Sequence, residues 1–326
     1  MTSSALTKLR RVSRQEPCSI CAHTSWCGIA DDGGLAICMR VANGAISTAR
    51  NGGHVHVLEP NRIPQAKPIH RKPEPPPAAS INRRHLVYKS LLASLELSQP
   101  HADNLSARGL SDQVIHLNGY ATLPSRMREV CKICKTLPLI EDLTHVPGFF
   151  LDHKKEWRFV ARKPGFLIPV RDVEGRIQAL QIRQDQEKTR YVWFSSPGLP
   201  SGASSGAPIH FARPALVEQD GEAVITEGPL KADVIAEKLN CCVVGVPGVS
   251  SFAVNFGSWL TFKLPKIKRV LIAYDADWKT KPQVKAALNR LIESVAEAEL
   301  QAVVLDWNGA KGLDDLLVKE VIQCQQ

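Results

Sequence analysis

The chain has 326 residues, and its 41 lysines and arginines outnumber its 32 aspartates and glutamates, which gives a formal net charge of +9. This length is sufficient for two or three domains, and the basic surplus favours a polyanionic partner such as nucleic acid. No apolar run approaches membrane-spanning length, and the N-terminus lacks the hydrophobic region of a secretory signal. We therefore expect a cytoplasmic protein with no membrane partner.

Four cysteines lie close together near the N-terminus. Residues 1–16 are polar and basic and predict a flexible arm, whereas residues 17–58 contain the cysteines and too few apolar residues for a conventional core. Such a segment, with two close cysteines followed by two more, predicts a ribbon folded around a structural Zn²⁺ ion. His23 is an alternative ligand, and four cysteines without a metal are the other interpretation. The predicted ligands are Cys18, Cys21, Cys27 and Cys38.

The remaining cysteines and histidines carry no predicted metal role. Cys131 and Cys134 have no second pair nearby and are expected on a helix. Cys241 and Cys242 precede an apolar run and are expected in the core. The alternating His54 and His56 are typical of a small strand.

A proline-rich stretch divides the chain. Such a stretch cannot form a regular helix or strand, so it predicts a semi-rigid basic linker over residues 59–80. From residue 81 the pattern turns helical, with apolar residues at helical spacing over 85–97, and Ser111 fits the N-cap of a further helix. Residues 81–215 are assigned to an α+β subdomain, in which strands are predicted at 157–163, 165–172 and 176–185, with a D-x-x-G turn between the last two.

The C-terminal segment, residues 216–326, alternates strands and helices. This alternation predicts an α/β domain whose mainly parallel sheet has helices on both faces. The expected strands lie near 223–227, 242–246, 269–275 and 301–306, and the expected helices near 229–239, 282–299 and 313–323.

Acidic side chains follow two of these strands. Glu227 ends one apolar run, and Asp275 and Asp277 follow another. The carboxyl ends of parallel strands meet at one edge of a sheet, so these carboxylates are expected to lie together. Clustered carboxylates in a basic protein are typical of Mg²⁺ held against a phosphate backbone or a polyphosphate. Asp314 and Asp315 provide a third acidic pair.

These motifs resemble the TOPRIM domain, and most of all the DnaG-type bacterial and phage primases. The resemblance covers about residues 85–318 and appears in the family's order. Besides the acidic elements, it rests on LSARGLSDQVIHLNGY, FLIPVRDVEGRIQALQIR, RYVWFSSP and IHFAR. The N-terminal cysteine ribbon matches the family's zinc ribbon in position, although its ligand spacing differs.

The resemblance implies roles for single residues. Glu227, Asp275 and Asp277 match the family's metal-binding carboxylates, and either Asp314 or Asp315 matches its last acidic ligand. Arg183, Arg190 and Arg213 match basic residues that line a groove for template and nucleotide. The chain departs from the family at Lys231, where an aspartate is usual, with Asp233 two residues further on. Lys231 is still counted among the catalytic residues, because a lysine beside the metals would contact phosphate, although it removes a metal ligand. Such departures favour a phage or mobile-element subgroup.

The implied function is a DNA-dependent RNA primase. It would use NTPs and Mg²⁺ or Mn²⁺ to synthesise short primers on a single-stranded DNA template. Arg40, Arg50 and Arg62 would assist the ribbon on DNA, with Trp26 either stacking on bases or packing against the metal knuckle. The sequence has no P-loop, so a replicative helicase partner would be a separate protein.

Two other functions remain open. The same carboxylates suit a TOPRIM nuclease, although the upstream arginine and Ser-Ser-Pro elements favour a primase; a topoisomerase would need a tyrosine in a large gate domain. The other alternative is a non-catalytic module that binds single-stranded DNA as a replication accessory. Lys231 and the altered last acidic element keep that interpretation open.

Overall fold

The computed structural model describes residues 9–49, 52–58, 76–137, 142–161, 163–186, 190–248 and 255–324, without the side chains of 320–324. The chain divides into two compact units, Met1–Glu74 and Pro75–Gln326. Most of the predicted linker lies outside the described residues. Within these ranges, no helix combines the length and apolar character that crossing a bilayer requires.

The N-terminal unit is a small antiparallel sheet. Its core contains Val12, Ile29 and three cysteines, so it is small, as the sequence predicts. Residues 9–11, assigned from the sequence to a flexible arm, instead form a strand that pairs with the segment after Cys27. The strand order is β1 (Leu9–Arg11), β2 (Gly28–Ala30), β3 (Leu35–Cys38), β5 (His54–Val57) and β4 (Ser47–Thr48).

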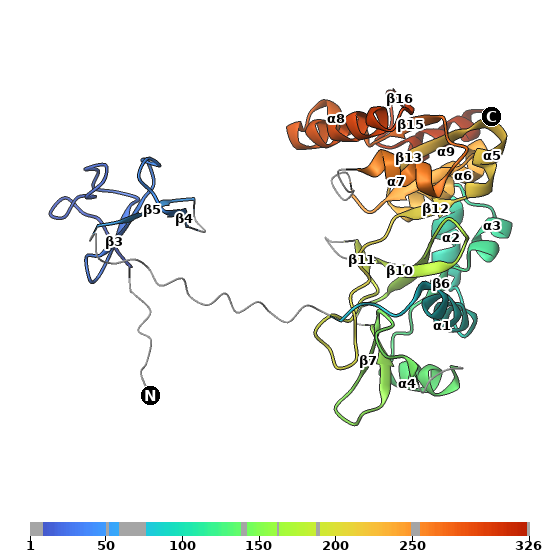
Figure 1. The fold of residues 1–326 in the computed structure, drawn as a ribbon. Coiled ribbons are helices and arrows are strands. Elements are labelled where there is room, and N and C mark those ends of the chain that lie inside the picture. Colours follow the sequence, from blue (N-terminus) through green and yellow to red (C-terminus); the bar gives the residue numbers. More distant parts are fainter. Residues whose placement is uncertain are drawn as a thin grey trace. The chain divides into compact units, whose positions relative to one another are not determined.

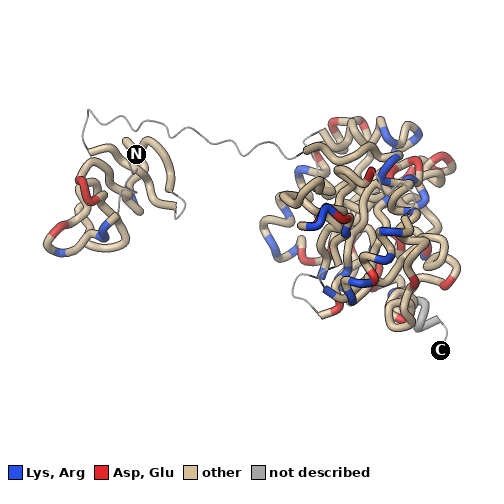
Figure 2. Tube along the Cα trace, turned by 90° about the horizontal axis from the view of Figure 1, so that it is seen from below, with Lys and Arg blue, Asp and Glu red and all other residues tan. Residues whose placement is uncertain are grey.

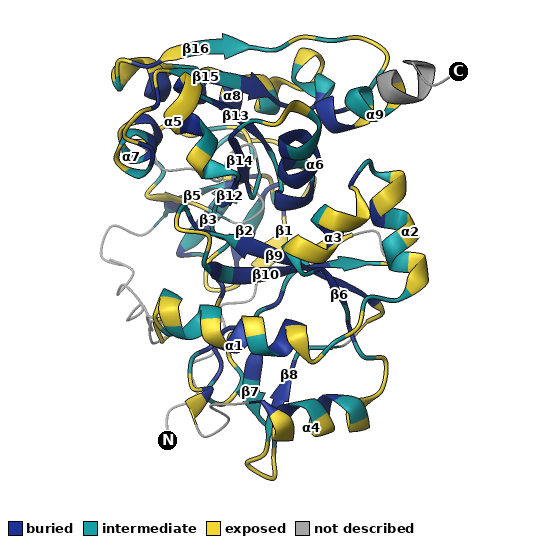
Figure 3. Ribbon diagram, turned by 90° about the vertical axis from the view of Figure 1, so that its right-hand side faces the viewer, coloured by how far each residue is buried: buried dark blue, intermediate teal, exposed yellow. Residues whose placement is uncertain are grey.

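The second unit begins with helices and an antiparallel sheet. The sheet order is β11 (Tyr191–Trp193), β10 (Ile177–Gln184), β9 (Gly165–Arg171) and β6 (Ala121–Thr122), and a separate hairpin pairs β7 (Phe149–Leu151) with β8 (Trp157–Phe159). The helices are α1 (Ile81–Ala93), α2 (Gln99–Ala107), α3 (Asp112–Asn118) and α4 (Met127–Thr136). Figure 3 shows how continuously β9 and β10 are buried.

Local capping explains several of these boundaries. The helical pattern predicted from residue 81 begins there, because the side chain of Ser80 accepts a hydrogen bond from the amide of Arg83 and caps the helix, which ends at Ala93 rather than at 97. Ser111 caps α3 as predicted. The predicted D-x-x-G turn is present between β9 and β10, where Gly175 has a φ of 79°. The prediction of helical Cys131 and Cys134 is confirmed by α4.

The C-terminal sheet has the order β12, β14, β13, β15, β16. Strands β13, β14, β15 and β16 are parallel to one another, as predicted, and β12 pairs antiparallel with β14 at one edge. The strands are β12 (His210–Ala212), β13 (Glu222–Glu227), β14 (Val243–Val246), β15 (Arg269–Ala273) and β16 (Gln301–Val304). The helices are α5 (Val217–Asp220), α6 (Pro229–Leu239), α7 (Phe256–Lys263), α8 (Pro282–Glu297) and α9 (Leu313–Cys324), with short 3₁₀ turns at Pro214–Leu216 and Ala276–Lys279.

Both faces of this sheet are covered, as alternation along β13 requires. Val224 packs in a cluster with α6 and α9, whereas Ala223 and Ile225 pack with α7 and α8 on the other face. Figure 1 shows these layers in orange and red. The helix α7 is a segment that the sequence pattern did not predict.

In the second unit, the C-terminal sheet domain and the preceding part with the antiparallel sheet share a hydrophobic core. Leu230 and Val234 of α6 pack against Phe166 and Ile168 of β9, together with residues of α2 and α3. This packing fixes the carboxyl edge of the C-terminal sheet relative to β10 and β11.

Candidate active site

Strand register brings the first acidic residues to one edge of the C-terminal sheet. Thr226 of β13 lies opposite Ala273 of the parallel β15, so Glu227 and Asp275 leave the sheet at the same edge. The hydroxyl of Thr226 donates to the carbonyl of Ala273, 3.2 Å away, and the amide of Asp275 donates to the Glu227 carboxylate.

The turn after β13 places a lysine in the same cluster. Gly228 has a φ of 83°, a conformation that favours glycine, and Pro229 at the start of α6 needs no amide partner. The chain therefore passes directly from strand to helix, and Lys231 lies in the first helical turn. Its ammonium forms an ion pair with Oδ1 of Asp275.

Asp314 joins the cluster from the first turn of α9. Its Oδ1 lies 4.0 Å from Nζ of Lys231, and its Oδ2 lies 3.8 Å from a guanidinium nitrogen of Arg108. Asp314 is 4% exposed, and its Oδ1 is buried without a hydrogen-bond partner. Asp315 is exposed. Of the two residues that the sequence left open, the structure brings Asp314 to the cluster.

Close packing around Asp314 depends on Gly312. A Cβ atom at this position would overlap Oδ1 of Asp314 and would lie 3.1 Å from Oδ1 of Asp275 and 3.2 Å from Nζ of Lys231. This position must therefore be a glycine if the three charged side chains are to lie this close together.

Two further lysines each pair with one more carboxylate oxygen. Lys311 lies 3.3 Å from Oδ2 of Asp275, and Lys281 lies 2.6 Å from Oδ2 of Asp277. The amide of Ala276 donates to the carbonyl of Lys311, which joins the loop after β15 to the segment before α9. Sequence reasoning did not single out these lysines or Arg108, although Lys311 and Arg108 lie within motifs that it used.

Burial and mutual repulsion change the proton affinities of the cluster. Burial and the neighbouring Asp275 raise the pKa of Glu227. Burial also raises the pKa of Asp314, against the opposing effect of Lys231. Burial alone would lower the pKa of Lys231, but Asp314, Asp275 and Glu227 together raise it.

Carboxylate oxygens are the donors that Mg²⁺ and Mn²⁺ prefer, and the orphaned Oδ1 of Asp314 is a buried acceptor in the same place. Glu227, Asp275 and Asp277 would hold such an ion, which would neutralise phosphate charge and lower the pKa of a bound hydroxyl. Within the described residues, however, no three acidic side chains converge as closely as the four cysteines do. Lysines pair with three of the carboxylate oxygens of this cluster, which are both oxygens of Asp275 and Oδ2 of Asp277.

A pocket of about 290 Å³ opens beside the cluster. Glu227, Lys231, Asp275 and Lys311 line one side of it, and residues of β10 and β11 line the other. Gln181 and Tyr191 are the residues from these strands. The pocket therefore combines acidic and basic side chains from one sheet with polar side chains from another.

The three predicted arginines occupy different places. Arg183 and Tyr191 are cross-strand partners and so point to the same face of their sheet. The Arg183 guanidinium lies 5.5 Å from the Phe166 ring centroid, with its Nε buried and unpaired. Arg190 is exposed beside β11. Arg213 donates to Asn240, the residue after α6, and so lies at the edge of the sheet opposite Glu227.

Asp233 does not belong to the acidic cluster. It is two residues beyond Lys231 on α6, so it points in a different direction. Its side chain is buried and accepts hydrogen bonds from Tyr120 and His210. Figure 2 shows lysines and arginines mixed with acidic residues over the second unit, as these pairings require.

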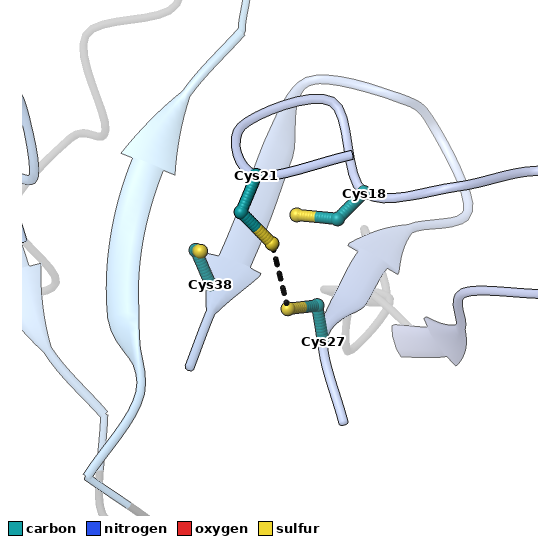
Figure 4. A group of neighbouring side chains, drawn as sticks. All are labelled: Cys18, Cys21, Cys27 and Cys38. Atoms are coloured by element: carbon teal, nitrogen blue, oxygen red, sulfur yellow. Dashed lines mark hydrogen bonds between the residues drawn. The ribbon is translucent and has the colours of Figure 1, made fainter. Parts of the chain in front are cut away.

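The four N-terminal cysteines converge (Figure 4). All four sulfur atoms lie within 4.8 Å of one another, and Cys21 and Cys27 are 3.7 Å apart. The amides of Met39 and Val41 donate to the sulfurs of Cys27 and Cys38, as in sites that hold thiolates. Burial raises the pKa of Cys21, but the His23 amide and the other thiols lower it to about 7. This donor set fits a structural Zn²⁺ ion, and His23 is outside it.

Trp26, beside Cys27, is 80% exposed and has a φ of 70°. The side chain therefore does not pack against the cysteine knuckle. Arg40 lies nearby, because its guanidinium donates to the carbonyl of Ser25. Arg50 and Arg62 lie outside the described residues.

Comparison with known proteins identifies the fold. A family model described as a domain of unknown function (DUF3854) matches residues 216–324. No curated protein sequence matches the chain. Among solved structures, it resembles the zinc-binding and RNA polymerase domains of the Aquifex aeolicus primase, at 17% identity and a TM-score of 0.58. That match covers 76% of this chain and 60% of the Aquifex chain.

Two more solved structures have a similar fold. A DnaG primase catalytic domain bound to single-stranded DNA is 17% identical, with a TM-score of 0.55 over 76% of this chain and 79% of that one. The RNA polymerase domain of Mycobacterium tuberculosis DnaG is 12% identical, with a TM-score of 0.55 over 75% and 84%. The chain has the α/β fold of DnaG-type primase catalytic cores, together with an N-terminal four-cysteine cluster suited to zinc.

Proposed function

We propose that this protein is a DNA-dependent RNA primase that synthesises short primers on single-stranded DNA. The substrates would be NTPs, the reaction a metal-dependent nucleotidyl transfer, and the setting the replication of a phage, plasmid or other mobile element. The observation that carries the proposal is the pocket in which Glu227, Asp275 and two lysines face Gln181 and Tyr191.

The pocket suits a triphosphate beside a nucleic-acid strand. Lys231 and Lys311 would donate to phosphate oxygens, and Arg183 and Arg190 would bind backbone phosphates on the β10–β11 side. Arg213 would act on DNA beyond the pocket, because it lies at the opposite edge of the sheet. In the reaction, the primer 3′-hydroxyl attacks the α-phosphate and pyrophosphate leaves. Glu227, whose pKa is raised, would either hold the metal ion or accept the hydroxyl proton.

Primer synthesis tests this proposal directly. Zinc-loaded protein would be incubated with mixed-sequence single-stranded DNA, labelled NTPs, and Mg²⁺ or Mn²⁺. We expect short labelled products from the wild type and none from the Asp275→Ala/Asp277→Ala double variant. Asp306→Ala is a matched control, because Asp306 is an exposed acid that pairs with Lys279 outside the cluster. Shortening of the template by the wild type would instead favour a nuclease.

One observation favours a second candidate, a module that binds single-stranded DNA without catalysis. Lysines already pair with both oxygens of Asp275 and one of Asp277, which reduces the attraction of the cluster for a divalent ion. Such a module would bind DNA equally well in a chelator of Mg²⁺, and the double variant would bind as the wild type does. Salt would weaken binding steeply in either case.

A further inference from the structure

The ammonium of Lys231 occupies a place that the surrounding side chains would otherwise offer to a metal ion. It pairs with Asp275 and lies 4.0 Å from Asp314, and Glu227 also stabilises its charge. We propose that Lys231 is a built-in cation that replaces one divalent ion between Asp275 and Asp314. Glu227, Asp275 and Asp277 would then hold a single divalent ion. The number of bound ions does not depend on the proposed function, whereas the role of Lys231 in catalysis rests on it.

The local backbone holds the ammonium in this place. Lys231 lies in the first turn of α6, whose start is fixed by Gly228 and Pro229. Its side chain is mostly buried, so its amine has few other positions. Gly312 supplies the space, because a side chain there would collide with Asp314 and crowd both Lys231 and Asp275.

Asp314 supplies independent evidence for a cation position. Its Oδ1 is buried without a hydrogen-bond partner, and the ammonium of Lys231 lies 4.0 Å from it. A buried carboxylate oxygen that lacks a partner is costly, and it is stabilised by a nearby positive charge. The ion pair with Arg108 is made through the other oxygen, at 3.8 Å. The role of Asp314 is therefore to hold Lys231 in place.

The charge balance of the cluster depends on this lysine. Glu227, Asp275 and Asp314 surround it, whereas Lys281 and Lys311 serve the outer oxygens of Asp277 and Asp275. Removing the Lys231 charge would leave neighbouring carboxylates without a cation between them. Such a pair binds a divalent ion, because carboxylate repulsion is relieved by the metal.

A built-in ammonium changes what the site offers a phosphate. A metal ion exchanges its ligands and binds only when it is available, whereas the lysine is permanent and donates hydrogen bonds from a fixed position. Lys231 lines the pocket beside Lys311. It would therefore bind a phosphate oxygen directly and leave a single divalent ion in the cluster.

Counting bound Mn²⁺ ions tests the inference without any assay of activity. Electron paramagnetic resonance of the zinc-saturated full chain measures free and bound Mn²⁺ during a titration. We expect Lys231→Met and Lys231→Gln each to bind one Mn²⁺ more than the wild type, with the added ion bound at least about tenfold more tightly than any second ion of the wild type. The glutamine side chain can still donate a hydrogen bond to Asp275, so the Lys231→Gln variant serves if the Lys231→Met variant does not fold.

Two controls isolate the charge at this position. Lys231→Arg keeps a cation and should bind as many ions as the wild type. Lys279→Met removes a lysine that is ion-paired to Asp306 outside the cluster, and it should also leave the count unchanged. Folded Met and Gln variants that bind no additional Mn²⁺ would overturn the inference.

The inference and the proposed function fail independently. If the wild type makes no primers but the Met or Gln variant gains an ion, the inference stands and primase activity does not. If the wild type makes primers and neither variant gains an ion, primase activity stands and the inference does not.

Discussion

The hydroxyl of Tyr120 donates a hydrogen bond of 2.5 Å to Oδ2 of Asp233, a residue 113 positions later in the chain. Tyr120 precedes β6, and Asp233 lies on α6, so the bond joins the antiparallel sheet to the C-terminal sheet. His210 of β12 lies 3.1 Å from the other oxygen. Its Nδ1 accepts from the amide of Arg171, so its Nε2 carries the proton and donates to Asp233.

Tyr120→Phe should destabilise the second unit. The change leaves a buried carboxylate oxygen without its donor, which costs about 1–3 kcal/mol in the free energy of unfolding. Urea denaturation followed by circular dichroism measures this difference. Tyr191→Phe is the matched control, because Tyr191 is partly exposed and should change stability little. Equal stability of the Tyr120 variant and the wild type would show that the bond contributes nothing.

Alkaline pH should unfold the second unit through its buried tyrosines. Burial raises the pKa of Tyr88 far above its usual value, and its hydroxyl donates to the carbonyl of Pro147, 2.9 Å away. A folded-state pKa above the unfolded value means that the stabilisation is complete below the unfolded pKa of about 10 and falls as the pH rises beyond it. Each such tyrosine adds a slope of about 1.4 kcal/mol per pH unit.

Tyr88→Phe isolates this effect from the titration of other groups. The free energy of unfolding, measured in urea at several pH values above 10, should fall less steeply with pH in the variant. The difference in slope should approach about 1.4 kcal/mol per pH unit. Parallel curves for the two proteins would mean that Tyr88 ionises in the folded state.

The cysteine cluster should bind about one zinc ion per chain, because four thiolates complete a tetrahedral site. Cys38→Ser should lose most of this zinc, since Cys38 is fully buried and its sulfur accepts from the amide of Val41. Cys131→Ser, on α4, should retain it. Metal analysis of the purified proteins measures the content, and stoichiometric zinc in the Cys38 variant would exclude that residue as a ligand.

Chain order and residue pattern predict the C-terminal sheet well. Its strands are short apolar runs between amphipathic helices, and parallel pairing then places Glu227 and Asp275 at one edge. The helix α7 is harder to predict, because its sequence FGSWLTFK has no polar face that would reveal a helical period. The N-terminal strands are too short for any periodicity.

Pairing between distant segments is the part of the site that the sequence does not predict. The sequence marks Lys231 as the loss of a possible metal ligand, but its ion pair with Asp275 depends on how α6 and β15 meet in space. Arg108 reaches Asp314 from another part of the chain. The place of Arg213 depends on the antiparallel direction of β12, which its three residues do not specify.

Trp26→Ala should weaken binding of single-stranded DNA. The side chain is exposed on a folded ribbon, next to an arginine whose guanidinium is anchored at Ser25. Base stacking on an aromatic ring contributes about 1–3 kcal/mol, so affinity should fall about 5- to 150-fold. Fluorescence anisotropy with a labelled oligonucleotide measures the dissociation constant at fixed salt.

Phe262→Ala is the matched control for Trp26, since Phe262 is also a large exposed aromatic residue but lies on α7 of the second unit. Both variants should keep the zinc content and unfolding midpoint of the wild type, because neither side chain is part of a core. A loss of affinity confined to the Trp26 variant would assign base stacking to the ribbon. An equal loss in both would indicate a general effect of exposed aromatic surface, and no loss in either would remove Trp26 from the nucleic-acid interface.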